Sequence, residues 1–239
     1  MIEGQVPCSQ KGNLIYHAYK LLKDTVSFHG GIHFQLKKYI PVGAGLGGAS
    51  ADAAYALLGI NKLYKLRLNL NYLIELGRKL GADVPFFLYP YATALGIEKG
   101  DMIIDLGVKS WYWILLVVFD ISLFTHEVYK TYQYPPRVQI NLTKLSHEVI
   151  MLSQFLARRD ILSLSRFLKN DLFRVASRKV PNIREILYLL KKNNAPACSM
   201  TGSGPTIFAL FNYKKDAQQA QKVLVSYKGI KTFICQTVH

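Results

Sequence analysis

The sequence contains few cysteines, and their spacing gives no pairing pattern. The three cysteines are Cys8, Cys198 and Cys235, and no two of them form a C-x-x-C pair. The six histidines also lack the spacing of metal ligands. These absences argue against a disulfide scaffold and the common zinc modules, and they favour a reducing compartment in which free cysteines act as small core residues. No metal-ligating residue is assigned.

Long hydrophobic runs and targeting segments are lacking as well. The longest apolar run, Trp111 to Phe119, is too short to cross a membrane and ends at Asp120. The first residues, Met-Ile-Glu-Gly-Gln-Val-Pro, do not have the pattern of a signal peptide. We therefore expect a soluble, cytoplasmic protein with no membrane partner, or one in a plastid-type compartment if the source is eukaryotic.

Acidic residues are scarce relative to basic ones. The 239 residues include 30 Lys and Arg against 15 Asp and Glu, a net charge of +15. This charge attracts polyanions, which include nucleic acid, a membrane surface and a nucleotide substrate. The basic residues are scattered with no basic tail, so charge alone does not choose among these partners. Half of the residues are hydrophobic, which is enough for a proper core.

The first half of the chain mixes helical and strand patterns. Apolar spacing predicts helices over 13–23, about 50–60 and about 70–80, with Asn13 and Gly81 as caps. Alternation predicts a half-buried strand over 31–40, and strands over 91–97 and 102–106 joined by a turn at 99–101. Pro85 is expected to force Val84 out of the helical region, which leaves Asp83 on an irregular turn.

The pattern of the second half also predicts a mixture of helices and strands, of the α+β class. A buried strand is predicted over 111–119, and a domain boundary near Val108 divides the chain into domains 1–108 and 109–239. Two helical stripes are predicted core, and Pro181 begins the second one. They consist of Leu145, Val149, Leu152 and Leu156, and of Ile183, Ile186, Leu187 and Leu190. A glycine-rich loop at 198–205, a strand over 206–211, a helix over about 214–226 and a strand over 231–236 complete a β-loop-β-α-β tail.

The most informative stretch is the glycine-rich segment at 40–54. Four glycines fall between positions 43 and 48, after a strand-like run and before an alanine-rich segment that favours a helix from Ala49 or Ser50. Glycine allows positive φ and a close approach of backbone N–H groups to a ligand. A glycine loop that leads into a helix N-terminus presents unpaired donors and the positive end of the helix dipole. A nucleotide phosphate is therefore expected here, with a plain strand-to-helix turn as the alternative.

Spacing separates three kinds of phosphate loop. Gly43, Gly45 and Gly48 satisfy G-x-G-x-x-G, but residues 61–72 contain no acid of the kind that the dinucleotide fold needs about twenty positions further on. The Walker pattern fails because Ala49 stands where its lysine must be. The third kind, Pro-x-Gly-x-Gly-Leu-Gly-Gly-x-Ser-Ala, is that of the GHMP small-molecule kinases, which Pro41 to Ala51 resembles at nearly every position.

Two further motifs occur in the order of that family. They are Gly-Ala-Asp-Val-Pro-Phe-Phe at 81–87 and Thr-Gly-Ser-Gly-Pro at 201–205. With the loop, they resemble the GHMP kinase that phosphorylates a cytidine-diphosphate derivative of methylerythritol in non-mevalonate isoprenoid synthesis. The resemblance implies an α+β GHMP kinase fold, with a ribosomal-S5-like first domain that is truncated at its start and a ferredoxin-like second domain. It also implies transfer of the γ-phosphoryl group of ATP, with Mg²⁺, to a substrate alcohol.

The resemblance assigns site residues by position. Asp83 would be the catalytic base that accepts the hydroxyl proton, the alternative being a turn aspartate bonded to its own backbone. Ser50 would help place Mg²⁺ or simply cap the helix. Tyr129 would stack on the cytosine of a small-molecule cytidine-diphosphate substrate. The residues expected around ATP are Pro41, Val42, Gly43, Ala44, Gly45, Leu46, Gly47, Gly48, Ala49, Ser50, Ala51, Thr201, Gly202, Ser203 and Gly204.

The start of the chain departs from the family pattern. The family opens with a Lys-[IL]-Asn-Leu strand that supplies a lysine beside the base, and nothing before Asn13 resembles it. Such a charge helps to offset negative charge at the reacting groups, so we expect weak ATP binding and slow or no turnover, restored by the missing strand. Alternatives are a GHMP kinase for homoserine, mevalonate or a sugar, a silent nucleotide-binding relative, and a basic nucleic-acid-binding protein. Oligomeric state is left open.

Overall fold

The computed structural model describes residues 2–3, 12–132 and 142–238. The chain forms two compact units. The first consists of Met1–Val42 and Gly47–Gly107, and the second of Gly43–Leu46 and Val108–His239. Four residues of the glycine-rich loop thus belong to the second unit, although the elements on either side of the loop belong to the first.

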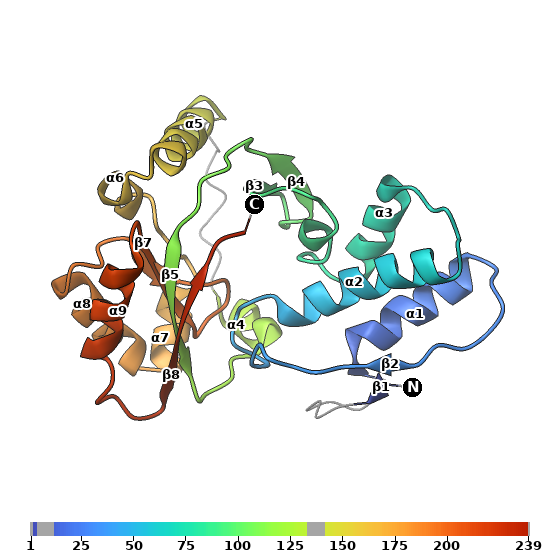
Figure 1. Cartoon of the computed structure of the whole chain (residues 1–239), viewed down its shortest axis with the longest axis horizontal. Coiled ribbons are helices and arrows are strands. Elements are labelled where there is room, and N and C mark those ends of the chain that lie inside the picture. The colour runs from blue at the N-terminus through green and yellow to red at the C-terminus, as the bar shows by residue number, and fades with distance from the viewer. Residues whose placement is uncertain (1, 4–11, 133–141, 239) are drawn as a thin grey trace. The chain divides into compact units, whose positions relative to one another are not determined.

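Three helices build the core of the first unit: α1 (Leu14–Thr25), α2 (Gly48–Leu63) and α3 (Leu70–Leu80). Figure 1 shows them as neighbouring ribbons. Asn13 caps α1, because its Oδ1 accepts a hydrogen bond of 2.9 Å from the backbone N–H of Ile15. The buried faces meet in one apolar cluster that includes Leu22, Leu57 and Leu73. The three predicted helices are confirmed, and α2 extends beyond the predicted 50–60 at both ends.

The strands of the first unit are short. β1 (Ile2–Glu3) pairs in parallel with β2 (Phe34–Gln35). β3 (Ala94–Ile97) and β4 (Met102–Asp105) form an antiparallel hairpin, which confirms the predicted strands around the turn at 99–101. The strand predicted over 31–40 is wrong in length. Alternation predicted the half-buried face, but the part of the chain that is described pairs only two residues there, and a strand needs a hydrogen-bonded partner.

The segment after α3 confirms one prediction and corrects another. Gly81 is the C-cap of α3, as predicted, and its φ of 170° is extended backbone. Val84 has φ −64° and ψ −42°, so the prediction that Pro85 keeps it out of the helical region is wrong. Pro85 begins the short 3₁₀ helix η2 (Pro85–Phe87), where its missing N–H has no cost. Asp83 lies on the turn, as predicted.

A four-stranded antiparallel sheet forms the framework of the second unit, in the order β6-β7-β5-β8. β5 (Trp113–Phe119) is central and carries the apolar run noted in the sequence. β6 (Cys198–Met200), β7 (Ile207–Phe211) and β8 (Ile230–Gln236) follow helices along the chain. The β-α-β-β-α-β order of the strands and helices is that of a ferredoxin-like domain, which confirms the expected class.

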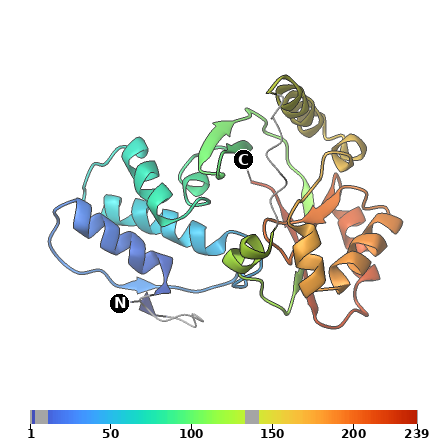
Figure 2. The ribbon, with the colours of Figure 1, turned by 180° about the vertical axis from the view of Figure 1, so that it is seen from behind.

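Among the described residues, the helices that accompany this sheet are α4 (Thr125–Thr131), α5 (Leu142–Arg158), α6 (Ile161–Ser165), α7 (Phe173–Lys179), α8 (Asn182–Lys192) and α9 (Lys214–Val223). α8 begins after Pro181 and buries Ile183, Ile186 and Leu190, as the helical stripe predicts. The stripe of α5 is not core, because its described members Val149, Leu152 and Leu156 are only partly buried. Figure 1 labels α8 and α9 next to each other beside the sheet, and Figure 2 shows the orange and red helices of this unit from behind. Within the portion that the structure describes, no helix is long and apolar enough to cross a membrane.

Candidate nucleotide and acceptor site

The glycine-rich loop has the backbone that its sequence predicts. Gly43, Gly45 and Gly47 have φ values of +71°, +71° and +67°, in the left-handed region that favours glycine. Gly47 is the N-cap of α2, and no side chain caps the helix there. The N–H groups of the first turn of a helix have no partner within the helix, so here they remain available to a ligand. Ser50 lies inside the helix, so the interpretation of Ser50 as its N-cap is wrong.

Within the second unit, the loop residues pack against the Thr-Gly-Ser-Gly motif. The hydroxyl of Thr201 donates a hydrogen bond of 2.8 Å to the carbonyl oxygen of Gly45. A Cβ atom added at Gly45 would lie 2.7 Å from the Gly204 carbonyl oxygen and 2.9 Å from that of Thr201. Only glycine therefore fits at position 45. Two motifs that are far apart in the sequence are brought together here.

The Thr-Gly-Ser-Gly motif is itself held by residues that sequence reasoning missed. The side-chain amide of Asn170 donates to the carbonyl oxygens of Met200 (2.8 Å) and Gly202 (2.9 Å). Its own carbonyl oxygen accepts from the N–H of Leu172 at 2.9 Å. No sequence pattern singles out Asn170, because its role depends on a contact about thirty residues along the chain.

Helix α4 brings the predicted stacking residue close to the same motif. Thr125 Oγ1 and the buried Ser203 Oγ lie 3.0 Å apart and share a hydrogen bond. Tyr129 follows Thr125 by one helical turn, so both project from one face of α4, and its side chain is 47% exposed. Lys179 fixes this helix through an ion pair of 2.8 Å with Glu127, and this hydrogen bond lowers the pKa of the Glu127 carboxyl.

Asp83 occupies an exposed turn of the first unit. Its carboxylate makes no hydrogen bond or ion pair with any residue that the structure describes, so the interpretation of Asp83 as an aspartate that closes its own turn is not supported. The segment that carries Asp83 packs near the start of α2. A Cβ atom at Gly47 would meet the ring of Phe87 at 2.9 Å, so η2 and the end of the glycine loop are in close contact.

An ion pair not expected from the sequence flanks the loop in the first unit. Lys38 Nζ lies 2.6 Å from Asp52 Oδ2, and the two side chains are 14% and 26% exposed. Lys38 precedes the loop and Asp52 is in the first turns of α2. The one signal in the sequence is a basic and an acidic residue on opposite sides of the glycines.

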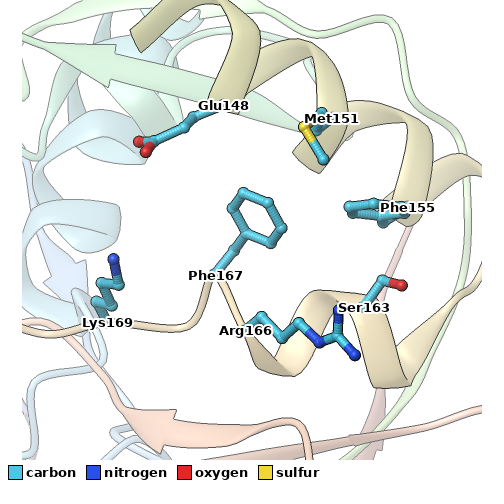
Figure 3. Close-up of a pocket in the computed structure, with 7 residues that line it drawn as sticks. All are labelled: Glu148, Met151, Phe155, Ser163, Arg166, Phe167 and Lys169. Atoms are coloured by element: carbon cyan, nitrogen blue, oxygen red, sulfur yellow. The ribbon is translucent and has the colours of Figure 1, made fainter. Parts of the chain in front are cut away.

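Two pockets of the second unit are lined by residues outside the motifs. Figure 3 shows one of about 270 Å³ between α5 and α6, with the ring of Phe167 projecting toward α5. Its lining is Glu148, Met151, Phe155, Ser163, Arg166, Phe167 and Lys169. The other, of about 470 Å³, includes Asn193, Asn212 and Asp216. Neither pocket contains a residue that the sequence analysis assigned to the site.

The thiols and the other candidate ligands do not form a metal site in the parts of the chain that are described. No group of three or more His, Cys, Asp or Glu residues lies close enough there to hold an ion. Cys198 is buried, and burial raises the pKa of its thiol to about 11. Cys198 is therefore a core residue of β6, as predicted for a free cysteine.

Comparison with known proteins first shows the broad class of protein to which this chain belongs. Residues 13–91 match the profile of the GHMP kinases N terminal domain, and residues 151–230 match that of the GHMP kinases C terminal domain. A crystal structure of homoserine kinase from Cytophaga hutchinsonii superposes with a TM-score of 0.77 at 20% identity, over 99% of this chain and 81% of that one. The fold and both domain matches are those of a GHMP kinase.

Relatives with higher sequence identity show to which family of GHMP kinases the chain belongs. The 4-diphosphocytidyl-2-C-methyl-D-erythritol kinase of Thermodesulfovibrio yellowstonii is 36% identical over 227 residues, which cover 95% of this chain and 78% of the relative. The enzyme of the same name from Geobacillus kaustophilus is 36% identical over 94% of this chain and 72% of the relative. A crystal structure of 4-(cytidine 5'-diphospho)-2C-methyl-D-erythritol kinase has a TM-score of 0.73 and 26% identity, over 100% of this chain and 83% of that one. The chain belongs to the 4-diphosphocytidyl-2-C-methyl-D-erythritol kinase family of GHMP kinases, whose members use ATP.

Proposed function

We propose that this protein transfers the γ-phosphoryl group of ATP to the 2-hydroxyl of 4-diphosphocytidyl-2-C-methyl-D-erythritol. The observation that carries the proposal is the uncapped start of α2, which follows three glycines in the left-handed region. The family relationship supplies the substrate, because the relatives that are about one third identical share this name.

The glycine-rich loop is suited to a triphosphate for two physical reasons. Its backbone N–H groups are donors with a fixed direction, and the helix dipole adds positive potential at the same point. The hydrogen bond from Thr201 to Gly45 fixes the loop before the nucleotide binds. A loop that is already ordered loses less conformational entropy on binding, so more of the interaction energy appears as affinity.

Asp83 is proposed as the base. In phosphoryl transfer the acceptor oxygen forms a bond to the γ-phosphorus while the bond to the leaving oxygen of ADP breaks, and the hydroxyl proton passes to a carboxylate. An exposed carboxylate with no partner in the described residues is available for this proton. Phe87, four residues after Asp83, contacts Gly47, so the proposed base lies on a segment that packs against the N-cap of α2 within the first unit.

Magnesium is proposed to accompany ATP rather than to occupy a protein cage. Mg²⁺ keeps several waters and is commonly held by substrate phosphates with one or two protein oxygens. Ser50, in the first turn of α2, would supply an oxygen.

Tyr129 is proposed to stack on the cytosine ring. Its half-exposed ring projects from α4 one turn beyond Thr125, which is hydrogen-bonded to the Thr-Gly-Ser-Gly motif. Stacking on an aromatic face contributes about 1–3 kcal/mol for a base. The nucleoside of the acceptor would thus be held by the second unit.

A panel of acceptors tests the proposal. ADP release would be measured with the cytidine-diphosphate substrate, homoserine, mevalonate and galactose at equal concentrations. The proposal predicts that kcat/KM for the cytidine-diphosphate substrate exceeds every other value by at least a hundredfold. A higher value for homoserine or mevalonate would assign the chain to another branch of the GHMP kinases. Absence of turnover with every acceptor, both in this chain and in one that carries the family's upstream Lys-[IL]-Asn-Leu strand, would contradict the proposed activity.

A further inference from the structure

Lys38 has an environment unlike that of its neighbour Lys37. The Lys38 side chain is 14% exposed, and its ammonium is 2.6 Å from Asp52 Oδ2. Lys37 is exposed, and its ammonium lies over the ring of Tyr39 at 5.2 Å from the centroid. The alternation of side chains along this segment thus turns one lysine outward and the next toward α2.

The ammonium of Lys38 lies against the first residue of α2. A Cβ atom built on Gly48 would be 3.3 Å from Lys38 Nζ and 3.1 Å from Ile40 Cγ2. Gly48 therefore has no room for a side chain, because Lys38 and Ile40 already occupy that space. A cation is thereby placed beside the N–H groups that open the helix.

This position is electrostatically unfavourable for a lone cation. The N-terminus of a helix carries about half a positive charge, so it attracts anions and repels an ammonium. Asp52 offsets this repulsion through one hydrogen bond, but an ammonium has three donors. Among the described residues no other acceptor is recorded for Lys38 Nζ, so its remaining donors are left for an anion bound beside Gly48.

We propose that Lys38 is a ligand of the nucleotide phosphates, which Asp52 holds beside Gly48 until the nucleotide binds. This inference rests on the proposed function, since it assigns the bound anion to ATP. When the phosphates bind, the ammonium is shared between them and the Asp52 carboxylate. Asp52 is thus a positioning residue that competes with the phosphates for the same cation.

Two single variants have opposite expected effects. Lys38→Met removes the cation and should weaken ATP binding at least tenfold. Asp52→Asn removes the competing carboxylate while leaving the ammonium, and should tighten ATP binding by about threefold. Lys37→Met, which deletes the same charge one residue away on the exposed side, is the control and should leave the Kd for ATP within twofold. Calorimetric titration with ATP at low and moderate salt measures all three.

A double variant separates ligand binding from a structural role. Lys38→Met together with Asp52→Asn leaves no unpaired charge, so it should fold, as its Tm would show, yet still bind ATP at least tenfold more weakly than wild type. Wild-type affinity in the double variant, or weakening by Asp52→Asn equal to that by Lys38→Met, would show that the pair only braces the loop and would overturn the inference. A wild-type protein that binds no ATP would instead contradict the proposed function.

Discussion

Gly45→Ala tests whether the glycine-rich loop is built by contact with the Thr-Gly-Ser-Gly motif. The added methyl group would lie 2.7–2.9 Å from three backbone atoms: the carbonyl oxygen and nitrogen of Gly204 and the carbonyl oxygen of Thr201. Backbone atoms cannot rotate away as side chains do, so the loop or the motif must move. The φ of +71° is a second obstacle, because an L side chain is strained there.

The expected magnitude follows from these two terms. The left-handed conformation costs about 1–2 kcal/mol for a residue other than glycine. Forcing an extra methyl group into a packed region costs about 1–3 kcal/mol. We expect Gly45→Ala to lower the free energy of unfolding by about 2–5 kcal/mol. We also expect a rise of at least tenfold in the KM for ATP, because the loop loses the Thr201 hydrogen bond.

Gly229→Ala is the matched control in the same unit. Gly229 has φ +77°, but an added Cβ atom would meet no atom within 4 Å. It should therefore show only the conformational cost of about 1–2 kcal/mol, with an unchanged KM for ATP. Urea unfolding and ADP-release kinetics measure both variants. Equal losses of stability in the two variants would refute the steric argument, and an unchanged KM in Gly45→Ala would refute the link between this contact and ATP binding.

Three other residues give separate predictions. Asn170→Ala deletes the hydrogen bonds to the carbonyl oxygens of Met200 and Gly202. The free energy of unfolding in urea should fall by about 1–3 kcal/mol, and the KM for ATP should rise. Unchanged values of both would show that Asn170 does not hold the motif in place. Tyr129→Ala should raise the KM for the cytidine-diphosphate substrate by about 5- to 150-fold and Tyr129→Phe should not, whereas equal KM values in both variants would rule out stacking. The pKa of Cys198 is raised to about 11, so the reactive thiolate is scarce below that pH. Iodoacetamide at pH 8 should therefore modify Cys198 only after unfolding, and mass spectrometry would contradict this by finding the label on the folded protein.

Local patterns in the sequence determined much of the fold. The periodic apolar stripes correctly predicted where α1, α3 and α8 lie in the sequence, because a helix forms its hydrogen bonds within itself and needs only one face to bury. The glycine spacing likewise gave the left-handed loop before α2. The length of β2 could not be predicted from the apolar pattern, because a strand extends only as far as its hydrogen-bonded partner, which the pattern of one segment does not reveal.

The conformation around Pro85 shows a limit of another kind. The residue before proline disfavours the helical region, but the preference is small beside the hydrogen bonds of a turn. Here the N–H of Val84 reaches the carbonyl oxygen of Gly81 at 3.1 Å, and the Val84 carbonyl oxygen accepts from Phe87 at 3.2 Å. Two backbone hydrogen bonds therefore outweigh the local preference.

The sequence likewise predicted one part of the candidate site and missed another. Motif spacing predicted roles for the loop, Asp83 and the Thr-Gly-Ser-Gly segment, because a phosphate-binding loop needs glycine at fixed positions. Asn170 and Lys38 escaped notice, since each acts through a contact that only the folded chain creates. Residues that support a loop carry no spacing of their own, and the structure is needed to find them.

The central claim is that Asp83 accepts the proton of a hydroxyl group aligned with the γ-phosphate of ATP. The most direct measurement compares kcat and the Kd for ATP in Asp83→Asn and wild type, with the cytidine-diphosphate substrate at saturation. A general base contributes about 10²- to 10⁴-fold to rate, so kcat should fall within that range while the Kd for ATP stays within threefold. A variant that turns over at the wild-type rate would contradict the account.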